Sequence, residues 1–119
     1  MKTKNELNLI ARNSGIERVR ILTRRYWQFV LDMVSDETLR FAETGQFEYK
    51  TGVIIPPNIG RMIIEDVQMT PSDVDNNILQ QLLIKTFKEY AFNNPVVSVT
   101  KMKSNEGVKI LVEVELNWK

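Results

Sequence analysis

The stretch VKILVEVELNW, from Val108 to Trp118, decides the fold of this chain. Its apolar residues fall on every second position, and the residues between them are polar or charged except for Leu111. Successive side chains of a strand point to opposite faces of a sheet. The alternation therefore predicts a strand of an antiparallel sheet that has one face on a core and one face in water.

A turn signal precedes this strand at residues 104–107, with the sequence Ser-Asn-Glu-Gly, and a second apolar run precedes the turn at residues 96–102. Together they predict a C-terminal antiparallel β-hairpin. We expect the last strand to be an edge that a neighbouring chain can pair with. Four of its residues are the expected contacts: Lys109, Glu113, Glu115 and Trp118.

A long amphipathic helix is predicted upstream of the hairpin. Residues 70–73, Thr-Pro-Ser-Asp, combine a capping hydroxyl, a proline at the first helical position and an acidic side chain in the first turn. Residues 93–95, Asn-Asn-Pro, end the helix. Apolar residues at helical spacing mark its buried face: Val74, Ile78, Leu79, Leu82, Leu83, Phe87, Tyr90 and Ala91.

Two helices are predicted at the N-terminus. Leu7, Ile10 and Ala11 have helical spacing, and Ser14 with Gly15 supplies a stop, because glycine readily adopts the left-handed conformation that closes a helix. A second helix restarts at Glu17. Residues 35–37 either interrupt that helix or cap a following helix that Gly45 ends.

The segment between residues 46 and 69 changes to a period of two, which predicts strands. A turn is expected at Thr51 and Gly52, a short strand at 53–55, a stop at two prolines, and a second strand at 61–67, forming a small hairpin or a flap. The prediction is a single α+β domain over residues 1–119. It holds two N-terminal helices, a short β-hairpin, a long amphipathic helix and a C-terminal antiparallel β-hairpin on one core.

Composition excludes several classes of function. The chain has 119 residues and no histidine or cysteine, so it lacks thiolate nucleophiles, histidine relays and the usual zinc ligands. No apolar run approaches the ~20 residues that span a bilayer, and the start of the chain lacks the apolar core of a secretion signal. We expect no membrane contact and a location in a virion or in host cytoplasm.

Charge is unevenly distributed although the formal net charge is only +1. Residues 1–25 carry a net +5, residues 26–75 carry a net −6, and residues 76–119 carry a net +2. Although the net charge is small, the charges are separated along the sequence. The molecule can therefore contact partners through surfaces of opposite sign.

Carboxylates supply the first candidate chemistry. Glu113 and Glu115 project from the same face of a strand, about 7 Å apart, where paired carboxylates divide acid and base roles or hold a metal. The alternative, which the alternation favours, is that they solvate the outer face of a sheet. Glu65 and Asp66 are expected on opposite faces of a strand, which argues against a shared metal. We expect no catalytic residue, metal or cofactor, and no enzyme.

A basic and partly aromatic helix supplies the second candidate. Arg20 and Arg24 lie one turn apart, a spacing that can grip successive phosphates, and an aromatic ring nearby can stack on a base. The alternative is that these arginines provide solubility and salt bridges. The candidate nucleic-acid or partner contacts are Arg18, Arg20, Arg24, Arg25 and Trp27.

The C-terminal half resembles a known family. From Asn58 to Trp118 a turn after proline, a Thr-Pro entry to a long helix, the motif Tyr-x-x-x-x-Pro-Val-Val and two strands ending KILVEVELNW follow in order. This order looks like the inner baseplate wedge family of contractile phage tails, which type VI secretion baseplates share. Asn94 to Val97 occupies the place of that family's Glu-Pro-Arg-Ile box. The resemblance implies a structural role among other baseplate proteins.

The N-terminal half is similar to the layout of the bacterial histone-like (HU) proteins. The similarity rests on TKNELNLIARNSGI, residues 3–16, a following helix, and TGVIIPPNIGRMII, residues 51–64. It implies DNA bending by a basic β-arm, but residues 65–75 are acidic here.

Two functions are therefore expected, in order of preference. The first is a non-enzymatic structural subunit of a phage tail, baseplate or neck, acting through protein-protein contacts in an oligomeric assembly. The second is a histone-like nucleic-acid-binding protein that uses its arginine-rich helix.

Overall fold

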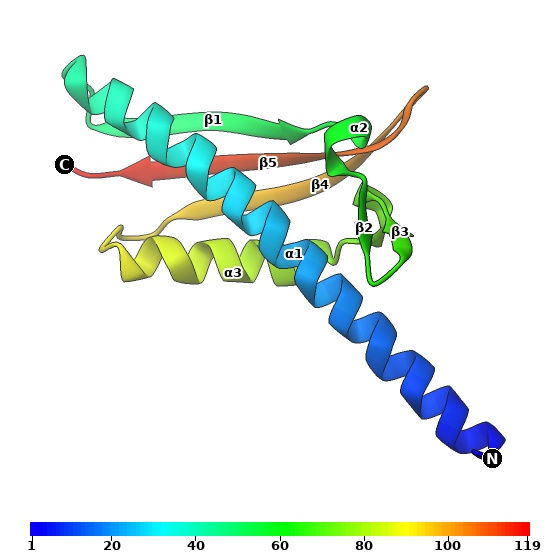
Figure 1. Cartoon of the computed structure of the whole chain (residues 1–119). Coiled ribbons are helices and arrows are strands. Elements are labelled where there is room, and N and C mark those ends of the chain that lie inside the picture. The colour runs from blue at the N-terminus through cyan, green and yellow to red at the C-terminus, as the bar shows by residue number, and fades with distance from the viewer.

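A three-stranded antiparallel sheet forms one layer of the structure, and β5, Gly107–Asn117, is its central strand. The computed structural model describes all residues from Met1 to Lys119. On one side β5 pairs with β1, Glu48–Ile55, and on the other side with β4, Val96–Ser104. Figure 1 shows the three strands lying side by side in the order β1, β5, β4.

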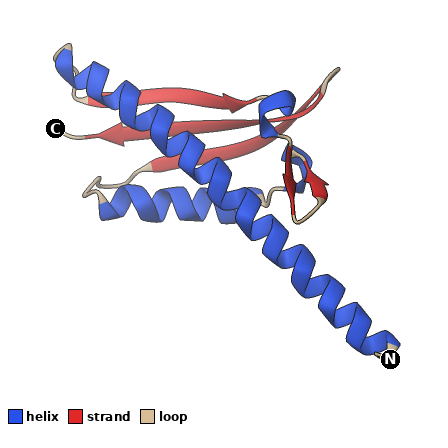
Figure 2. Ribbon diagram, viewed as in Figure 1, coloured by secondary structure: helices blue, strands red, loops and turns tan.

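Two helices form the second layer, on one face of this sheet. They are α1, Lys4–Glu43, which runs diagonally across the strands, and α3, Asn76–Glu89, which runs nearly parallel to them beside β4 (Figure 2). Short elements link β1 to α3 at one end of the sheet. They are α2, Pro57–Gly60, the hairpin of β2, Met62–Ile64, and β3, Val67–Met69, and the 3-10 turn η1, Pro71–Asp73.

The core lies between the two layers, and it confirms the inward face predicted for β5. Four alternate side chains of that strand, from Ile110 to Leu116, are buried, and they face buried residues of α1 such as Leu22, Tyr26 and Val30. The α+β class and the C-terminal hairpin are confirmed. The hairpin turn lies where it was predicted, because Ser104 pairs with Gly107.

The prediction of two N-terminal helices is wrong, because α1 is one continuous helix of 40 residues. Gly15 lies inside it and keeps a helical conformation, since its φ is not positive. A glycine inside a helix costs only about 1 kcal/mol relative to alanine, and long helical runs on both sides outweigh that cost. Gly45, with a φ of +85°, follows the end of the helix, as expected.

The prediction that the last strand is an edge is also wrong. Lys109, Glu113, Glu115 and Trp118 do not border an open edge, because β1 arrives from much earlier in the sequence and pairs along β5 from Glu48 to Ile55. The backbone N–H of Trp118 donates to the carbonyl of Phe47 at 3.0 Å, which extends this pairing to the end of the chain. The open edges of the sheet belong to β1 and β4.

The strands between residues 46 and 69 pair differently from the predicted hairpin. Thr51 and Gly52 lie inside β1 and form no turn, and this strand pairs with β5 instead of with residues 61–67. The small hairpin is instead β2 with β3, and its turn is Glu65 and Asp66, with φ values of 50° and 63°. These two carboxylates therefore lie in a turn and not on a strand.

The long helix begins later than its predicted start. Thr70 is the N-cap of η1, and its backbone N–H donates to the carboxylate of Asp73 at 2.8 Å. Asp75 is the true N-cap of α3, because its side chain accepts from the backbone N–H groups of Asn77 and Ile78. The helix packs through Leu79, Leu83 and Phe87, whereas Ile78 and Tyr90 of the predicted stripe are exposed.

The inward and outward faces of β5 predict opposite effects for two neighbouring substitutions. Ile110→Asp places a charge in the fully buried core of the central strand and is expected to lower the free energy of unfolding by about 4 kcal/mol or more. Lys109→Asp, on the outer face, is expected to leave the fold intact. Urea denaturation followed by circular dichroism compares them, and equal losses would show that the assignment of the faces is wrong.

Gly15, inside α1, and Gly45, just beyond its C-terminal end, are predicted to respond in opposite ways to replacement by alanine. Gly15→Ala adds a Cβ whose nearest neighbour is a terminal nitrogen of Arg18 at 3.9 Å, so it is expected to stabilise the helix by about 1 kcal/mol. Gly45→Ala meets no atom within 4 Å but is strained by its φ of +85°, so it is expected to destabilise by about 1 kcal/mol.

Amide hydrogen exchange of the first four turns of α1 is the measurement for Gly15→Ala, because those turns can open without global unfolding. Slower exchange is expected in the variant. Faster exchange would mean that the chain breaks at Gly15 in solution.

Candidate functional site

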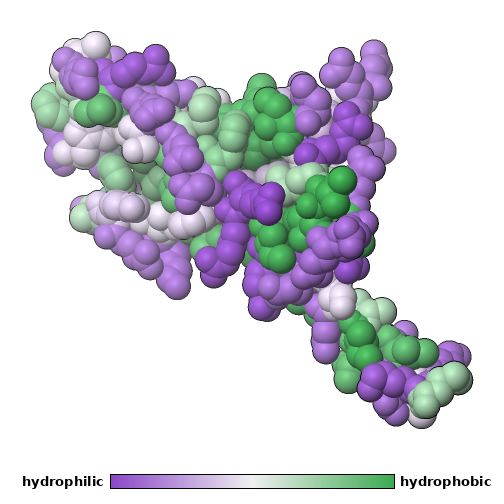
Figure 3. All heavy atoms as spheres, viewed as in Figure 1, coloured by the Kyte–Doolittle hydropathy of each residue, from purple (hydrophilic) through white to green (hydrophobic).

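The N-terminal part of α1 projects beyond the sheet and forms an arm, which we define as residues 4–16. Figure 1 shows this blue segment leaving the body of the molecule, and every residue from Met1 to Asn13 is exposed. Figure 3 shows hydrophobic residues on the projecting segment beside hydrophilic ones. Residues 4–13 of the arm therefore carry apolar side chains that their own chain does not cover.

Apolar side chains lie on two sides of the arm. Leu7 and Ile10 are 53% and 48% exposed and lie one turn apart, whereas Leu9 and Ile16 are 59% and 58% exposed. Leu7 and Leu9 lie about 200° apart around the helix axis, so the two pairs belong to different sides. Isolated helices of this length are marginal in water, which makes a partner for these side chains physically favourable.

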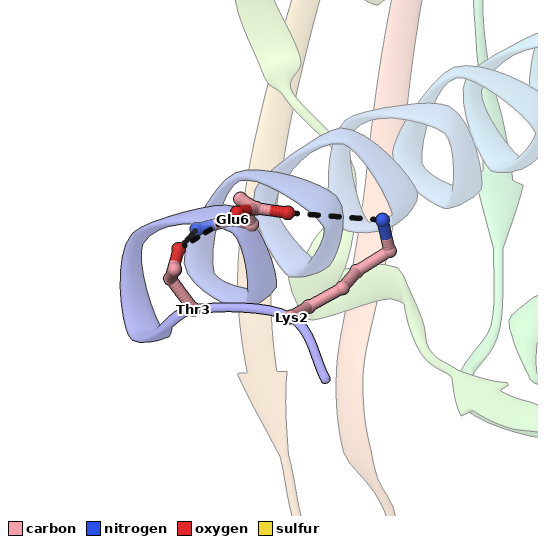
Figure 4. A network of polar contacts seen from close by, with 3 residues as sticks. All are labelled: Lys2, Thr3 and Glu6. Atoms are coloured by element: carbon pink, nitrogen blue, oxygen red, sulfur yellow. Dashed lines mark hydrogen bonds and ion pairs between the residues drawn. The ribbon is translucent and has the colours of Figure 1, made fainter.

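Local contacts start the arm, as Figure 4 shows. The backbone N–H of Glu6 donates to the Thr3 hydroxyl at 3.2 Å, and this hydroxyl donates to the Glu6 carboxylate at 3.1 Å. Lys2 forms an ion pair with the same carboxylate at 3.8 Å. The helix is thus capped at its tip, and Glu6 neutralises Lys2 while Lys4 and Arg12 keep free charges.

A groove lies at the opposite end of the molecule, where α1 and α3 diverge toward their C-terminal ends (Figure 1). Its volume is about 630 Å³, and Leu116 of β5 lies at its base. The lining includes two acidic side chains, Asp32 and Glu89, and no basic one. The apolar and aromatic lining residues besides Leu116 are Trp27, Leu31, Val34, Phe87, Tyr90 and Phe92.

A second cleft, of about 600 Å³, lies where the arm joins the body. Ile16 and Val19 of α1 face Ile78 of α3 across it. Arg12 and Arg20 contribute two positive charges to its lining, against the single negative charge of Asp75. The two hollows therefore differ in the sign of their charge.

The structure does not bring the predicted arginine and tryptophan contacts into one site. The indole N–H of Trp27 donates to the hydroxyl of Thr86 at 2.8 Å, so this ring joins α1 to α3 and is half-buried. Arg20 forms an ion pair with Glu17 at 3.3 Å. Arg24 and Arg25 are exposed, and Arg18 is half-buried.

Glu113 and Glu115 lie on the outer face of the sheet, as the alternation predicts. Glu115 forms an ion pair with Lys50 of β1 at 3.2 Å, and Glu113 is aligned with Gly52 and with Ser98 on the neighbouring strands. The chain contains no group of three or more side chains of the histidine, cysteine, aspartate or glutamate types with the geometry to hold a metal ion.

Sequence reasoning missed the groove, whose walls come from distant segments of the chain. The spacing of Leu7 and Ile10 predicted an amphipathic helix. It did not show that both side chains would stay exposed in the folded chain.

Comparison with protein-family models, curated proteins and solved structures finds no match to this chain. No helix of the chain combines the length and the apolar character needed to cross a lipid bilayer.

Two buried tyrosine side chains, Tyr26 and Tyr49, have pKa values shifted from the ordinary value. The Tyr26 hydroxyl donates to the carbonyl of Gly60, and the Tyr49 hydroxyl donates to the carboxylate of Glu37 at 2.7 Å. Burial raises the pKa of both tyrosines well above the ordinary value, and for Tyr49 the hydrogen bond to Glu37 raises it further.

The raised pKa values predict a loss of stability in alkali. The unfolded chain releases phenol protons near the ordinary pKa of about 10, while the folded chain still holds them. The contribution of Tyr26 and Tyr49 is therefore complete below pH 10 and falls as the pH rises above that value. Urea denaturation at pH 8 and at pH 11 measures this loss, which is expected to shrink in Tyr26→Phe with Tyr49→Phe. An equal loss in that variant would contradict the assignment.

Proposed function

We propose that this protein is a non-enzymatic structural subunit of a phage tail, baseplate or neck, or of a related injection machine, and that it works through protein-protein contacts. The observation that carries the proposal is the arm. Leu7 and Ile10 are half exposed on a helix that leaves the body of the domain, and no other part of the chain covers them. Such a helix gains stability when a protein partner buries its apolar side.

The sequence resemblance supplies the class of assembly. Residues 58–118 resemble the inner baseplate wedge family of contractile tails, whose members are structural. The wide charge separation of the chain, a net +5 in residues 1–25 against a net −6 in residues 26–75, supports contacts through surfaces of opposite sign.

The alternative of nucleic-acid binding is less well supported. Of its expected contacts, Trp27 hydrogen-bonds inside the protein and Arg20 pairs with Glu17. The half-buried Arg18 with the exposed Arg24 and Arg25 leaves a weaker phosphate-binding surface than the sequence indicated.

Co-expression with the products of the neighbouring genes, among which the proposal expects tail and baseplate proteins, tests the proposal. Size-exclusion chromatography with light scattering is expected to give a complex of defined stoichiometry that contains this chain. The Leu7→Ser and Ile10→Ser double variant is expected to weaken recovery of the chain in that complex, because it removes two exposed apolar contacts. Ile63→Ser, at an apolar residue of β2 that is even more exposed, is the control and is expected to have no effect.

Two outcomes would contradict the proposal. One is the absence of any complex with these proteins. The other is a mass increase with duplex DNA that falls steeply with salt and disappears in Arg20→Ala with Arg24→Ala, because that result identifies the nucleic-acid-binding alternative.

A further inference from the structure

We propose that the arm of one molecule docks into the groove of a second copy of this chain, so that the molecules join head to tail. The groove is the hollow of about 630 Å³ between the C-terminal parts of α1 and α3. This inference rests on the proposed function, since it names the first partner of the structural subunit. It concerns contacts between identical chains, which the proposed function leaves open.

The arm cannot fill the groove of its own molecule. Ile10 of the arm and Leu31 of the groove belong to the same unbroken helix. A rise of 1.5 Å per residue places them about 32 Å apart along a straight axis. Because α1 has no hinge, the occupant of the groove has to come from another molecule.

The dimensions of the two parts match. The groove wall on α1 runs from Trp27 to Thr38, which is about 17 Å of helix, and the arm of residues 4–16 is about 18 Å long. Leu7, Ile10 and Ala11 follow the spacing by which an amphipathic helix anchors in an apolar groove. The aromatic lining of the groove supplies the side chains that dominate such contacts.

Charge selects this groove among the surfaces that the arm could meet. Lys4, which forms no ion pair, lies one turn from Leu7 on the neighbouring side of the arm, and the only charged lining residues of the groove are Asp32 and Glu89. Pairing of two arms would instead bring like charges together. The cleft at the base of the arm carries two arginines among its lining residues, so it also repels a basic helix.

A contact between two different surfaces has a consequence for assembly. Each molecule that offers an arm still has an empty groove, so the contact repeats until the molecules close into a ring or extend as a filament. A subunit that repeats in this way suits the rings and stacked layers of a tail.

The test uses two variants of the full-length chain that break opposite halves of the contact. The arm variant is Leu7→Ser with Ile10→Ser, and the groove variant is Asp32→Lys with Glu89→Lys. All four side chains are exposed, so both variants are expected to keep the circular dichroism and melting temperature of the wild type. Sedimentation velocity is measured on the purified chain without any other protein.

The wild type is expected to self-associate in a manner that increases with concentration. Each variant alone is expected to raise the dissociation constant at least about tenfold. A mixture of the two is expected to form a 1:1 dimer that grows no further, because only the arm of the groove variant and the groove of the arm variant remain intact. Leu9→Ser with Ile16→Ser, on the other side of the arm, is the matched control and is expected to associate as the wild type does.

Three results would overturn the inference. A groove variant that self-associates like the wild type would mean that arms pair with arms. A mixture that remains monomeric would mean that the two surfaces do not meet. A wild type that is monomeric at every concentration, yet still enters a complex with tail proteins, would refute docking between copies and leave the proposed function standing.

Discussion

The hydrogen bonding of β5 on both of its edges is the constraint on which the rest of the structure depends. A central strand has no unpaired backbone groups, so it needs one partner from each side. The hairpin supplies β4 locally, and β1 has to come from far upstream in the sequence. The buried side chains of β5, Ile110 to Leu116, then set the face on which both helices must pack.

Because α1 packs on that face as one continuous helix, its N-terminal part extends beyond the sheet. Buried residues from Leu22 to Val34 anchor the second half of the helix on the sheet, and the first half extends from that anchor into solvent. One rigid element thereby carries a basic, half-apolar tip at one end and one wall of an acidic, aromatic groove at the other. The uneven charge along the sequence therefore places a basic surface and an acidic surface at opposite ends of α1.

Much of the fold was predictable because its signals are local. The alternation of β5, the turn at 104–107 and the stop at Gly45 each depend on residues that are neighbours in the chain, and each is confirmed. Predictions from a single residue were wrong where the preferences of the surrounding residues had the larger effect. Gly15 is a helix breaker by itself, yet it lies within a long helix because the capped turns before it and the packed turns after it outweigh a cost of about 1 kcal/mol.

The candidate site was less predictable than the fold. Trp27 was a candidate contact to a nucleic acid or a partner, but its indole N–H donates to the hydroxyl of Thr86, a residue 59 positions away. The groove is assembled from α1, α3 and β5, so no stretch of sequence contains it. The spacing of Leu7 and Ile10 predicted an amphipathic helix. Such spacing is the same whether the apolar side packs on the core of its own chain or remains exposed.

By itself, the sequence determined the class of the domain, the inward face of its last strand, the C-terminal hairpin and the polarity of its charge, because period, turn chemistry and charge are properties of neighbouring residues. Only the tertiary structure decided that β5 lies in the middle of the sheet, that the first 43 residues contain one helix, and that its tip is uncovered while a groove opens at its other end. These features depend on which distant segments meet, and long-range pairing is governed by the burial of the whole core rather than by any local preference.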